Sequence, residues 1–275
     1  MPELAEVDFY RQRWEAAGSG HRIVAVRLHP GAKVFRGVKP ADIRRTLLGA
    51  RMLSSETAGK QMLFRFEREA WLGLHLGMTG ELKVEPRGHA AGKHDHLLLD
   101  TAAATLVFTD PRMFGRVQWH HGAEPPSWWT RIAPAILSRA FTVEAVSLFL
   151  RRRARAPIKA VLLMQERFPG IGNWMADEIL WRAALHPKQP AGSLTPAEVR
   201  TLWRECRRVC RLALAAIAGH GDRHAPDLNR YIPDSWLFHH RWEAGGRCPR
   251  TGQPLVREEI GGRTACWSPA RQVLH

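Results

Sequence analysis

The second residue of the chain is a possible nucleophile with two carboxylates beside it. The sequence begins Met1-Pro2-Glu3-Leu4-Ala5-Glu6, so removal of Met1 would free the secondary amine of Pro2. A terminal α-amine has an ordinary pKa of about 7.7 to 8.0, against about 10.4 for lysine, so a useful fraction is neutral and nucleophilic at physiological pH. Such an amine can form an iminium with an aldehyde carbon. The alternative is that Pro2 only begins a helix, where its fixed φ and missing N–H are harmless, and residue 2 alone favours this alternative.

A glycine turn in the second half of the chain is a candidate phosphate site. Residues 169–173 read Pro-Gly-Ile-Gly-Asn and precede an apolar i, i+4 stripe through Met175, Ile179 and Ala183. Asn173 is predicted to be the N-cap of this helix. A helix N-terminus presents backbone N–H groups, and glycines let a phosphate approach them closely. An ordinary glycine turn explains the pattern equally well.

Arg263 is a third candidate, because it follows the paired glycines Gly261 and Gly262 between two apolar segments, 255–260 and 263–267. Paired glycines suit a two-residue hairpin turn. The guanidinium at such a tip can hold a phosphate with two hydrogen bonds. A tip arginine that is only solvated is the alternative.

The elements that must position these residues are short strands in the first half of the chain and helices in the second half. An opening helix through Leu4–Trp14 ends at Gly18, and short strands without intervening helices then predict a sandwich or barrel. The strands are predicted at residues 23–28, 62–66, 71–76, 96–99, 105–109 and 117–119.

From about Val143 the periodicity is helical. Thr195, Pro196 and Glu198 form a capping box at the start of a helix that continues to Ile217. Cys206 and Cys210 lie on its apolar stripe, which favours core packing over a metal or disulfide role. We predict an N-terminal domain at 1–130, a linker at 131–142, a helical domain at 143–230 and a terminal hairpin at 231–275.

Composition indicates a negatively charged partner. The 41 Lys and Arg exceed the 26 Asp and Glu by 15, and the pI is near 10.8, which makes nucleic acid the leading candidate. The dense basic run at 151–155 is of a kind that usually forms a solvated face. No signal peptide or apolar run of about 20 residues is present. A soluble, cytoplasmic and nucleoid-associated protein is expected.

Six short motifs give the chain a resemblance to the formamidopyrimidine-DNA glycosylase and endonuclease VIII family of base-excision repair enzymes. The resemblance runs nearly from end to end, and the number, order and spacing of the motifs carry it. They lie at residues 2–7, 59–60, 75–80, 93–96, 109–115 and 170–173 with 177–178. The resemblance implies an α+β multidomain protein: a β-sandwich with an opening helix, a helix-two-turn-helix domain and a hairpin finger.

The resemblance also implies roles for individual residues. The Pro2 amine would attack C1′ of a damaged nucleotide, expel the base and form a Schiff base that leads to strand cleavage. Glu3 would be the general acid and base, and Glu6 would support the nucleophile. Lys60 is assigned to catalysis and phosphate binding, and His75, Asn173 and Arg263 to phosphate binding. The implied partner is double-stranded DNA with damaged bases or abasic sites, bound by a monomer.

Such an enzyme takes the damaged base out of the stack, and the void that remains costs a few kcal/mol. Met78, Arg112 and Phe114 match the residues that fill this void in the family. Core packing is the alternative for Met78 and Phe114. The glycines at 77, 80 and 115 favour exposed loop tips and therefore the functional role.

The finger departs from the family pattern of two CxxC pairs around zinc. This chain has Cys248 and Thr251 in the first pair, and Ser268 and Arg271 in the second. Tetrahedral zinc needs four Cys, His or carboxylate ligands, so we predict a zincless finger and no cofactor. A disulfide between Cys248 and Cys266 is an alternative that a reducing cytoplasm disfavours. Packing is predicted to replace the metal through Trp242, Leu255, Val256, Ile260 and Trp267.

Two smaller departures concern the substrate. Ala5 stands where the family often has proline, and residues 219–224 replace a Gly-Gly-Thr type segment of oxidised-guanine enzymes. Ring-opened purines or hydantoins are the first expectation, and oxidised pyrimidines the second. A catalytically silent binder of lesions or abasic sites is the competing hypothesis, but it would not need Pro2, Glu3 and Glu6 together. A general nucleic-acid-binding protein leaves the motifs of the first half unexplained.

Overall fold

The computed structural model describes residues 2–29, 31–220 and 228–274. The chain divides into two compact units, one made of Met1–Ile132 and Ala218–Pro226, the other of Ala133–Ile217 and Asp227–His275. The four-part division given above remains a prediction. Within the segment 219–224, residues 221–224 lie outside the described residues.

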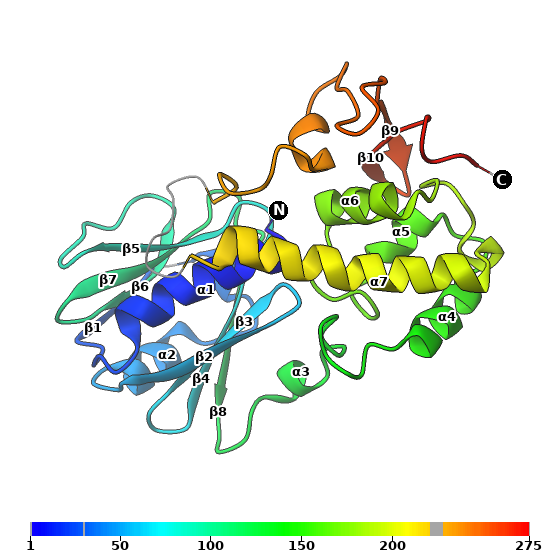
Figure 1. Ribbon diagram of the computed structural model, residues 1–275. Helices are drawn as coiled ribbons and strands as arrows, with labels where there is room; N and C mark the ends of the chain where they lie inside the picture. The colour runs from blue at the N-terminus through cyan, green and yellow to red at the C-terminus, as the bar shows by residue number, and fades with distance from the viewer. Residues whose placement is uncertain (1, 30, 221–227, 275) are drawn as a thin grey trace. The chain divides into compact units, whose positions relative to one another are not determined.

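The first unit is built from two four-stranded antiparallel sheets and the opening helix (Figure 1). One sheet has the order β1-β6-β7-β5, with β1 Ala25–Leu28, β6 Asp95–Asp100, β7 Ala104–Thr109 and β5 Glu81–Pro86. The other has the order β2-β3-β4-β8, with β2 Met52–Ala58, β3 Gln61–Phe66, β4 Ala70–His75 and β8 Arg116–His121. Helix α1, Leu4–Gly18, contacts strands of both sheets.

The six predicted strands are confirmed, and two further strands, β2 and β5, were missed. Strand β2 reads Met-Leu-Ser-Ser-Glu-Thr-Ala and buries only Met52 fully, so it has no apolar run to detect. Strand β5 buries only Leu82 fully. Both are edge strands, and pairing with β3 and β7 stabilises them although their composition does not favour a strand.

Three short elements complete the first unit: η1 at Lys33–Phe35, α2 at Pro40–Leu47 and α3 at Ser127–Thr130. Element η1 contacts β8, and α2 contacts β1. A Cβ at Gly73 of β4 would come within 2.2 Å of the Trp128 ring. Glycine therefore lets the indole of α3 lie directly on the strand.

The second unit is helical, with α4 Val143–Arg152, α5 Ile158–Leu162, α6 Asn173–Ala183, η2 Ala191–Ser193, α7 Pro196–Ala213, η3 Leu214–Ala218 and η4 Leu237–His240. The predicted capping box is confirmed: the Thr195 hydroxyl accepts from the Glu198 N–H, and the Glu198 carboxylate accepts from the Thr195 N–H. Cys206 and Cys210 are fully buried in the core, as predicted.

The predicted N-cap role of Asn173 is wrong. Gly172 is the N-cap, and Asn173 is the first residue of α6. The extended backbone of Gly172 continues the turn by one residue, and the Asn173 side chain is thereby released from capping. It can make other contacts.

The predicted terminal hairpin is confirmed as β9 Val256–Ile260 and β10 Arg263–Trp267, paired antiparallel. Gly261 and Gly262 both have positive φ, 60° and 74°, which a two-residue primed turn requires. A Cβ on Gly261 would lie 2.7 Å from Cβ of Ala160. The turn therefore packs against α5.

No helix in the described part of the chain combines the length and the apolar character needed to cross a membrane.

Candidate functional site

The Glu3–Glu6 pair organises the N-terminus of α1. Glu3 is the N-cap: its backbone N–H donates to Oε2 of Glu6 at 3.2 Å, and its carboxylate accepts the Glu6 N–H. Both carboxylates are buried, with 2% and 7% exposure. Pro2 precedes the cap and is partly exposed. The helix begins at Leu4, so the alternative that Pro2 only begins a helix is wrong.

Lys60 and His75 are neighbours at the end of the β2–β3–β4 sheet. Lys60 follows the positive-φ Gly59 in the β2–β3 turn and is buried. The pKa of His75 is lowered from its ordinary value of 6.5, first by burial and then by the charges of Lys60 and Arg36. Its Nδ1 accepts the Gly77 N–H at 3.1 Å. The proton of the neutral ring therefore resides on Nε2, which is left as a donor.

The loops 76–80 and 110–115 are packed against each other through glycine. A Cβ on Gly77 would lie 2.5 Å from the Gly115 nitrogen, and Gly77 has φ +63°. Buried Asp110 joins the two loops: its Oδ1 accepts from the Thr79 hydroxyl at 2.8 Å and its Oδ2 from the Gly115 N–H at 2.7 Å. The backbone of Asp110 is held in turn by His96, whose Nε2 lies 2.9 Å from the Asp110 carbonyl oxygen.

This pair of loops exposes the predicted void-filling residues. Met78 is 37% and Phe114 50% exposed, and Arg112 is also exposed. The Arg112 guanidinium lies 4.7 Å from the Phe114 ring centroid. Core packing, the alternative for Met78 and Phe114, is therefore wrong for these two side chains.

The second unit brings together the other predicted phosphate-binding residues. Nδ2 of Asn173, at the start of α6, donates to the Thr264 carbonyl at 2.9 Å. Thr264 follows Arg263, which is exposed at the hairpin turn. Asn173 and Arg263 are thus linked by one hydrogen bond between the helix and the hairpin.

A buried ion network fixes the same hairpin to α6. Nζ of Lys159 lies 2.5 Å from Asp177 Oδ1, and Arg241 Nη2 lies 2.6 Å from Oδ2. Asp177 Oδ2 also accepts the backbone N–H of Cys266 in β10 at 3.1 Å. Lys159 Nζ donates further to the Asn173 carbonyl at 2.7 Å. One carboxylate on α6 therefore positions both the hairpin strand and the turn that carries Asn173.

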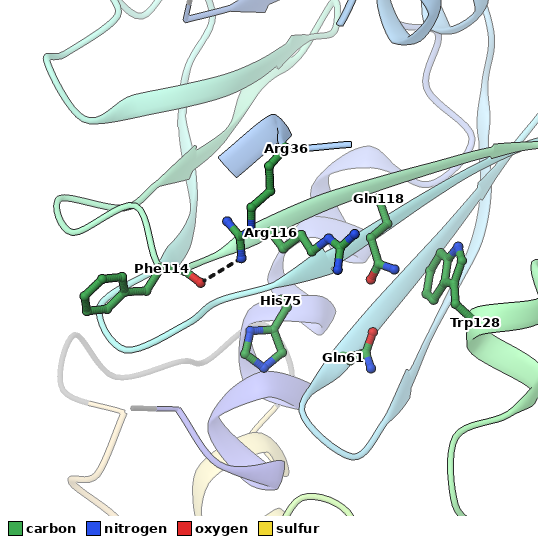
Figure 2. A pocket seen from close by; sticks show the side chains of 7 residues that line it. All are labelled: Arg36, Gln61, His75, Phe114, Arg116, Gln118 and Trp128. Carbon is green, nitrogen blue, oxygen red and sulfur yellow. Dashed lines mark hydrogen bonds between the residues drawn. The ribbon is translucent and has the colours of Figure 1, made fainter. Parts of the chain in front are cut away.

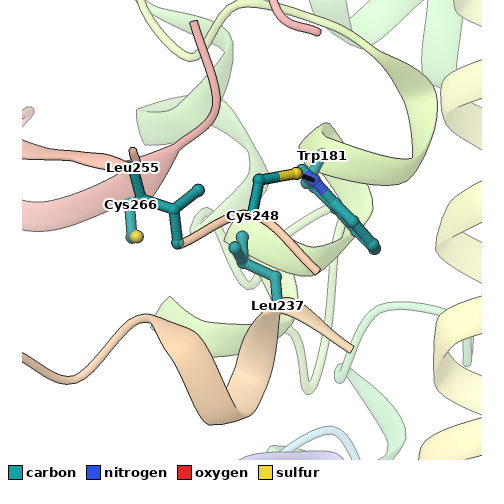
Figure 3. Packing of buried hydrophobic residues seen from close by; sticks show 5 residues of the cluster. All are labelled: Trp181, Leu237, Cys248, Leu255 and Cys266. Atoms are coloured by element: carbon teal, nitrogen blue, oxygen red, sulfur yellow. Dashed lines mark hydrogen bonds between the residues drawn. The ribbon is translucent and has the colours of Figure 1, made fainter. Parts of the chain in front are cut away.

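The hairpin packs on α6 through a small apolar cluster, shown in Figure 3 and made of Trp181, Leu237, Cys248, Leu255 and Cys266. Leu255 and Ile260 are buried as predicted, whereas Val256 and Trp267 are partly exposed. The prediction for Trp242 is wrong, because its side chain is 51% exposed. Trp181, which the sequence did not single out, is the largest member of the cluster and is fully buried.

The four positions of the family's zinc ligands do not fit a zinc ion. Trp181 Nε1 donates to the Cys248 sulfur at 3.4 Å. The Arg250 and Arg271 guanidinium groups lie 4.6 and 5.5 Å from the Trp181 ring centroid. Zinc needs four anionic or imidazole ligands, and cations beside a single thiol disfavour a divalent cation. The described residues include no group of three His, Cys, Asp or Glu that could hold a metal, and all four cysteines are free thiols.

Sequence reasoning missed three residues that position the site: Arg36, Asp110 and Asp177. Asp110 and Asp177 stood inside motifs without a role. The burial of these two carboxylates indicates their role, and burial cannot be read from a single sequence. Arg36 donates to the Gly115 carbonyl at 2.7 Å from a distant part of the chain, and no pattern in its own segment indicates that contact.

The fold and site define a class: a basic, two-unit protein with a proline at residue 2 before two buried carboxylates, and with exposed side chains at the tips of two loops packed against each other. Two family models match, the formamidopyrimidine-DNA glycosylase N-terminal domain over residues 1–117 and the formamidopyrimidine-DNA glycosylase H2TH domain over residues 132–222. The chain belongs to the formamidopyrimidine-DNA glycosylase family.

Relatives agree over the full length. A formamidopyrimidine-DNA glycosylase of Thermus thermophilus is 37% identical over 283 residues, covering 99% of this chain and 98% of the relative. That of Ligilactobacillus salivarius is 32% identical, covering 100% and 99%. A solved structure of the Lactococcus lactis enzyme, non-covalently bound to DNA with an abasic site, has a TM-score of 0.84 at 23% identity and covers 98% of this chain and 99% of its own. This last likeness shows the shared fold.

Proposed function

We propose that this DNA glycosylase of base-excision repair excises oxidised or ring-opened bases through a Schiff base on Pro2 and then cleaves the strand by elimination. Family membership establishes the glycosylase class. The observation that supports the proline as nucleophile is its position. Pro2 lies before the N-cap of α1 and directly beside two buried carboxylates. The helix therefore does not use the Pro2 nitrogen.

In the proposed reaction the Pro2 nitrogen forms a bond to C1′ while the bond from C1′ to the base nitrogen breaks. The amine proton passes to the departing base. Glu3 then donates a proton to the ring oxygen as the bond between C1′ and that oxygen breaks, which leaves the iminium form of the Schiff base between C1′ and the Pro2 nitrogen. Abstraction of a C2′ proton then expels the 3′ phosphate by β-elimination. Covalent catalysis divides one difficult displacement into easier steps. Glu6 holds Glu3 in place through the backbone hydrogen bond.

The other site residues are proposed to hold the everted nucleotide. Lys60, His75, Asn173 and Arg263 would bind backbone phosphates. Met78, Arg112 and Phe114 would fill the void in the duplex. The exposure of these three side chains on two interlocked loops supports that role, because a wedge must protrude on a rigid support to keep bases apart.

Borohydride trapping tests the catalytic proposal. The protein, with Met1 removed, is mixed with a duplex that contains an abasic site and is reduced with borohydride. Wild type should give a covalent adduct, and Pro2→Gly, whose terminal amine is primary and differently placed, should give far less. A chain blocked at its terminus should give none. If wild type gives no adduct on abasic or lesion-containing duplexes, the chain is a silent binder and the proposal is wrong.

We also propose that the finger holds no zinc and that the enzyme needs no cofactor. The donor set at residues 248, 251, 268 and 271 supports this. We further propose that the enzyme acts as a monomer on double-stranded DNA in the cytoplasm, in association with the nucleoid. Ring-opened purines or hydantoins are its proposed substrates, and a panel of duplexes with one lesion each would rank them against 8-oxoguanine and oxidised pyrimidines.

A further inference from the structure

An open pocket on the first unit concentrates positive charge beside His75. It has a volume of about 320 Å³ (Figure 2). Its nitrogen donors belong to Arg36, Gln61, His75, Arg116 and Gln118, and no described residue that lines it carries a carboxylate. Neither arginine forms an ion pair with any carboxylate of the described residues. Both arginines are exposed to solvent, so an anion can reach their guanidinium groups.

The chemistry of the pocket suits a phosphodiester. Burial, Lys60 and Arg36 lower the pKa of His75, so the ring is neutral and presents Nε2–H as a donor. Arginine can donate two parallel hydrogen bonds to a phosphate, and the Gln61 and Gln118 amides can each donate as well. Trp128 closes the side of the pocket opposite Phe114 (Figure 2).

Arg36 also holds the loop that carries Phe114. Its Nη1 donates to the Gly115 carbonyl at 2.7 Å, and Nη2 makes a longer contact of 3.5 Å with the Phe114 carbonyl (Figure 2). A guanidinium has five N–H donors, so these contacts leave donors for a ligand. Arg36 comes from the turn after η1, far from the loop in sequence. One side chain therefore connects the pocket to the void-filling loop.

We propose that this pocket binds a backbone phosphate of the damaged DNA through Arg36 and Arg116, and that Arg36 couples phosphate binding to the position of Phe114. This inference rests on the proposed function, because it takes DNA as the ligand. Arg116 is a binding residue in this scheme. Arg36 is both a binding residue and a positioning residue.

Affinity and its salt dependence test the phosphate contact. Binding to a duplex with a tetrahydrofuran abasic-site analogue, which the enzyme cannot cleave, is followed by fluorescence anisotropy over a range of salt concentrations. Arg116→Ala should bind about tenfold more weakly, and its slope of log K against log salt should fall by about 0.9. Arg87→Ala, which removes an exposed arginine from the β5–β6 turn, is the matched control and should change neither as much. A wild-type slope in both Arg36→Ala and Arg116→Ala would overturn the proposal.

Neutralising single phosphates identifies which backbone phosphate occupies the pocket. Each phosphate near the analogue is replaced in turn by an uncharged methylphosphonate. One position should weaken wild-type binding about tenfold and weaken Arg116→Ala much less, because the contact is already lost. If every position weakens wild type and Arg116→Ala equally, no phosphate occupies the pocket.

A fluorescent base opposite the lesion tests the coupling through Arg36. 2-Aminopurine at that position reports unstacking when the void-filling loop enters the duplex. At protein concentrations that saturate the DNA, Arg116→Ala should give the wild-type signal, whereas Arg36→Ala should give a reduced one. Arg36→Lys keeps the charge but lacks the planar fork of five donors that lets arginine reach the Gly115 and Phe114 carbonyls and a phosphate together, so it should recover affinity more than signal. Wild-type signal in Arg36→Ala would refute the coupling.

The two proposals can fail separately. A wild type that forms no borohydride adduct but shows the Arg36 and Arg116 effects on binding refutes the role of Pro2 and leaves the pocket assignment standing. A wild type that forms the adduct, with variants that bind like wild type, refutes the pocket assignment alone.

Discussion

At the scale of single residues, Glu3 has a structural task in the helix cap, and we propose a chemical task for the same carboxylate. Its carboxylate accepts the Glu6 N–H as part of the α1 capping box, and its own N–H is held by Glu6. The cap fixes the carboxylate next to Pro2. A group that transfers protons needs such fixed geometry, and the hydrogen bonds of the helix terminus supply it here.

Glu3→Gln separates these tasks. Glutamine keeps an oxygen acceptor for the Glu6 N–H, so the fold should be retained, but it cannot donate or accept the catalytic proton. Base release from a lesion-containing duplex should slow by about 100- to 10,000-fold in single-turnover assays. Glu6→Gln is the matched control, because a capping box tolerates glutamine at this position, and its loss should be smaller. Equal rates for Glu3→Gln and wild type would contradict the assignment.

His75 should make the free energy of unfolding decrease as the pH becomes acidic. Its pKa is lowered from 6.5 in the folded protein by burial, with Lys60 and Arg36 adding to the effect. As the pH falls below 6.5, the unfolded chain takes up a proton that the folded protein resists, so His75 reduces the free energy of unfolding at acidic pH. Urea unfolding between about pH 7 and pH 5 should show a steeper loss for wild type than for His75→Gln. Parallel losses would contradict it.

At the scale of elements, two loops form one rigid platform because glycine allows their backbones to touch. Gly77 must adopt φ +63° and lies against the backbone of Phe114 and Gly115. Asp110 adds hydrogen bonds to both loops. Exposed side chains on such a platform can act as wedges, since the backbone beneath them cannot yield.

Gly77→Ala should therefore disturb both stability and excision. The left-handed conformation alone costs about 1–2 kcal/mol for alanine, and the clash with the 114–115 backbone adds to it. Gly88→Ala is a matched control, because Gly88 has φ +81° but nothing within 4 Å of an added Cβ. Urea unfolding should show a larger loss for Gly77→Ala, and only this variant should lose excision activity. Equal losses in the two variants would show that the loops can separate.

The finger hairpin is anchored by a carboxylate of α6. Asp177 compensates the fully buried Lys159 and the nearly buried Arg241, and it accepts the Cys266 N–H of β10. Asp177→Asn leaves two buried cations without their counter-charge, which typically costs about 3–5 kcal/mol. Glu258→Gln removes a more exposed pair with Lys188 and should cost about 1 kcal/mol or less. Urea unfolding of the two variants compares them, and similar small losses would refute the anchoring role.

At the scale of the whole molecule, the proposed absence of zinc has a direct test. Family members with four cysteines tie the finger together through the metal, whereas here the Trp181 cluster and the Asp177 network connect the finger to α6. A chelator should therefore leave the thermal unfolding midpoint and the DNA affinity unchanged. Elemental analysis of the purified protein should find far less than one zinc per chain. Stoichiometric zinc, or a lower midpoint with chelator, would overturn the proposal.

Cys248 occupies one of the four positions that bind zinc in other members of the family. Burial raises the pKa of its thiol, but the hydroxyls of Thr251 and Ser268 and the indole N–H of Trp181 outweigh burial and bring the pKa down to about 7. Two of the family's four zinc-ligand positions, 251 and 268, thus carry hydroxyl groups in this chain. These donors face the remaining sulfur and favour its thiolate, the form that a metal would otherwise stabilise.

Local patterns were enough to predict the elements with strong periodicity or caps. Helix α7 was predicted from its capping box and apolar stripe, and the hairpin from its paired glycines. Strands β2 and β5 were missed because their stability comes from pairing with β3 and β7, which a local pattern does not contain. The N-cap of α6 was placed one residue late, because Gly172 and Asn173 are both acceptable caps by composition.

The sequence by itself determined the family, the order of the motifs, the residues proposed to fill the void and the absence of cysteine at positions 251, 268 and 271, because each depends on residue type and spacing. Only the tertiary structure decided which side chains support them. Asp110, Asp177 and Arg36 act across distances of many residues, and their roles follow from burial and from partners that the fold brings near. Burial makes an ion pair or a hydrogen bond decisive for stability and position, and burial is a property of the folded chain rather than of any segment of it.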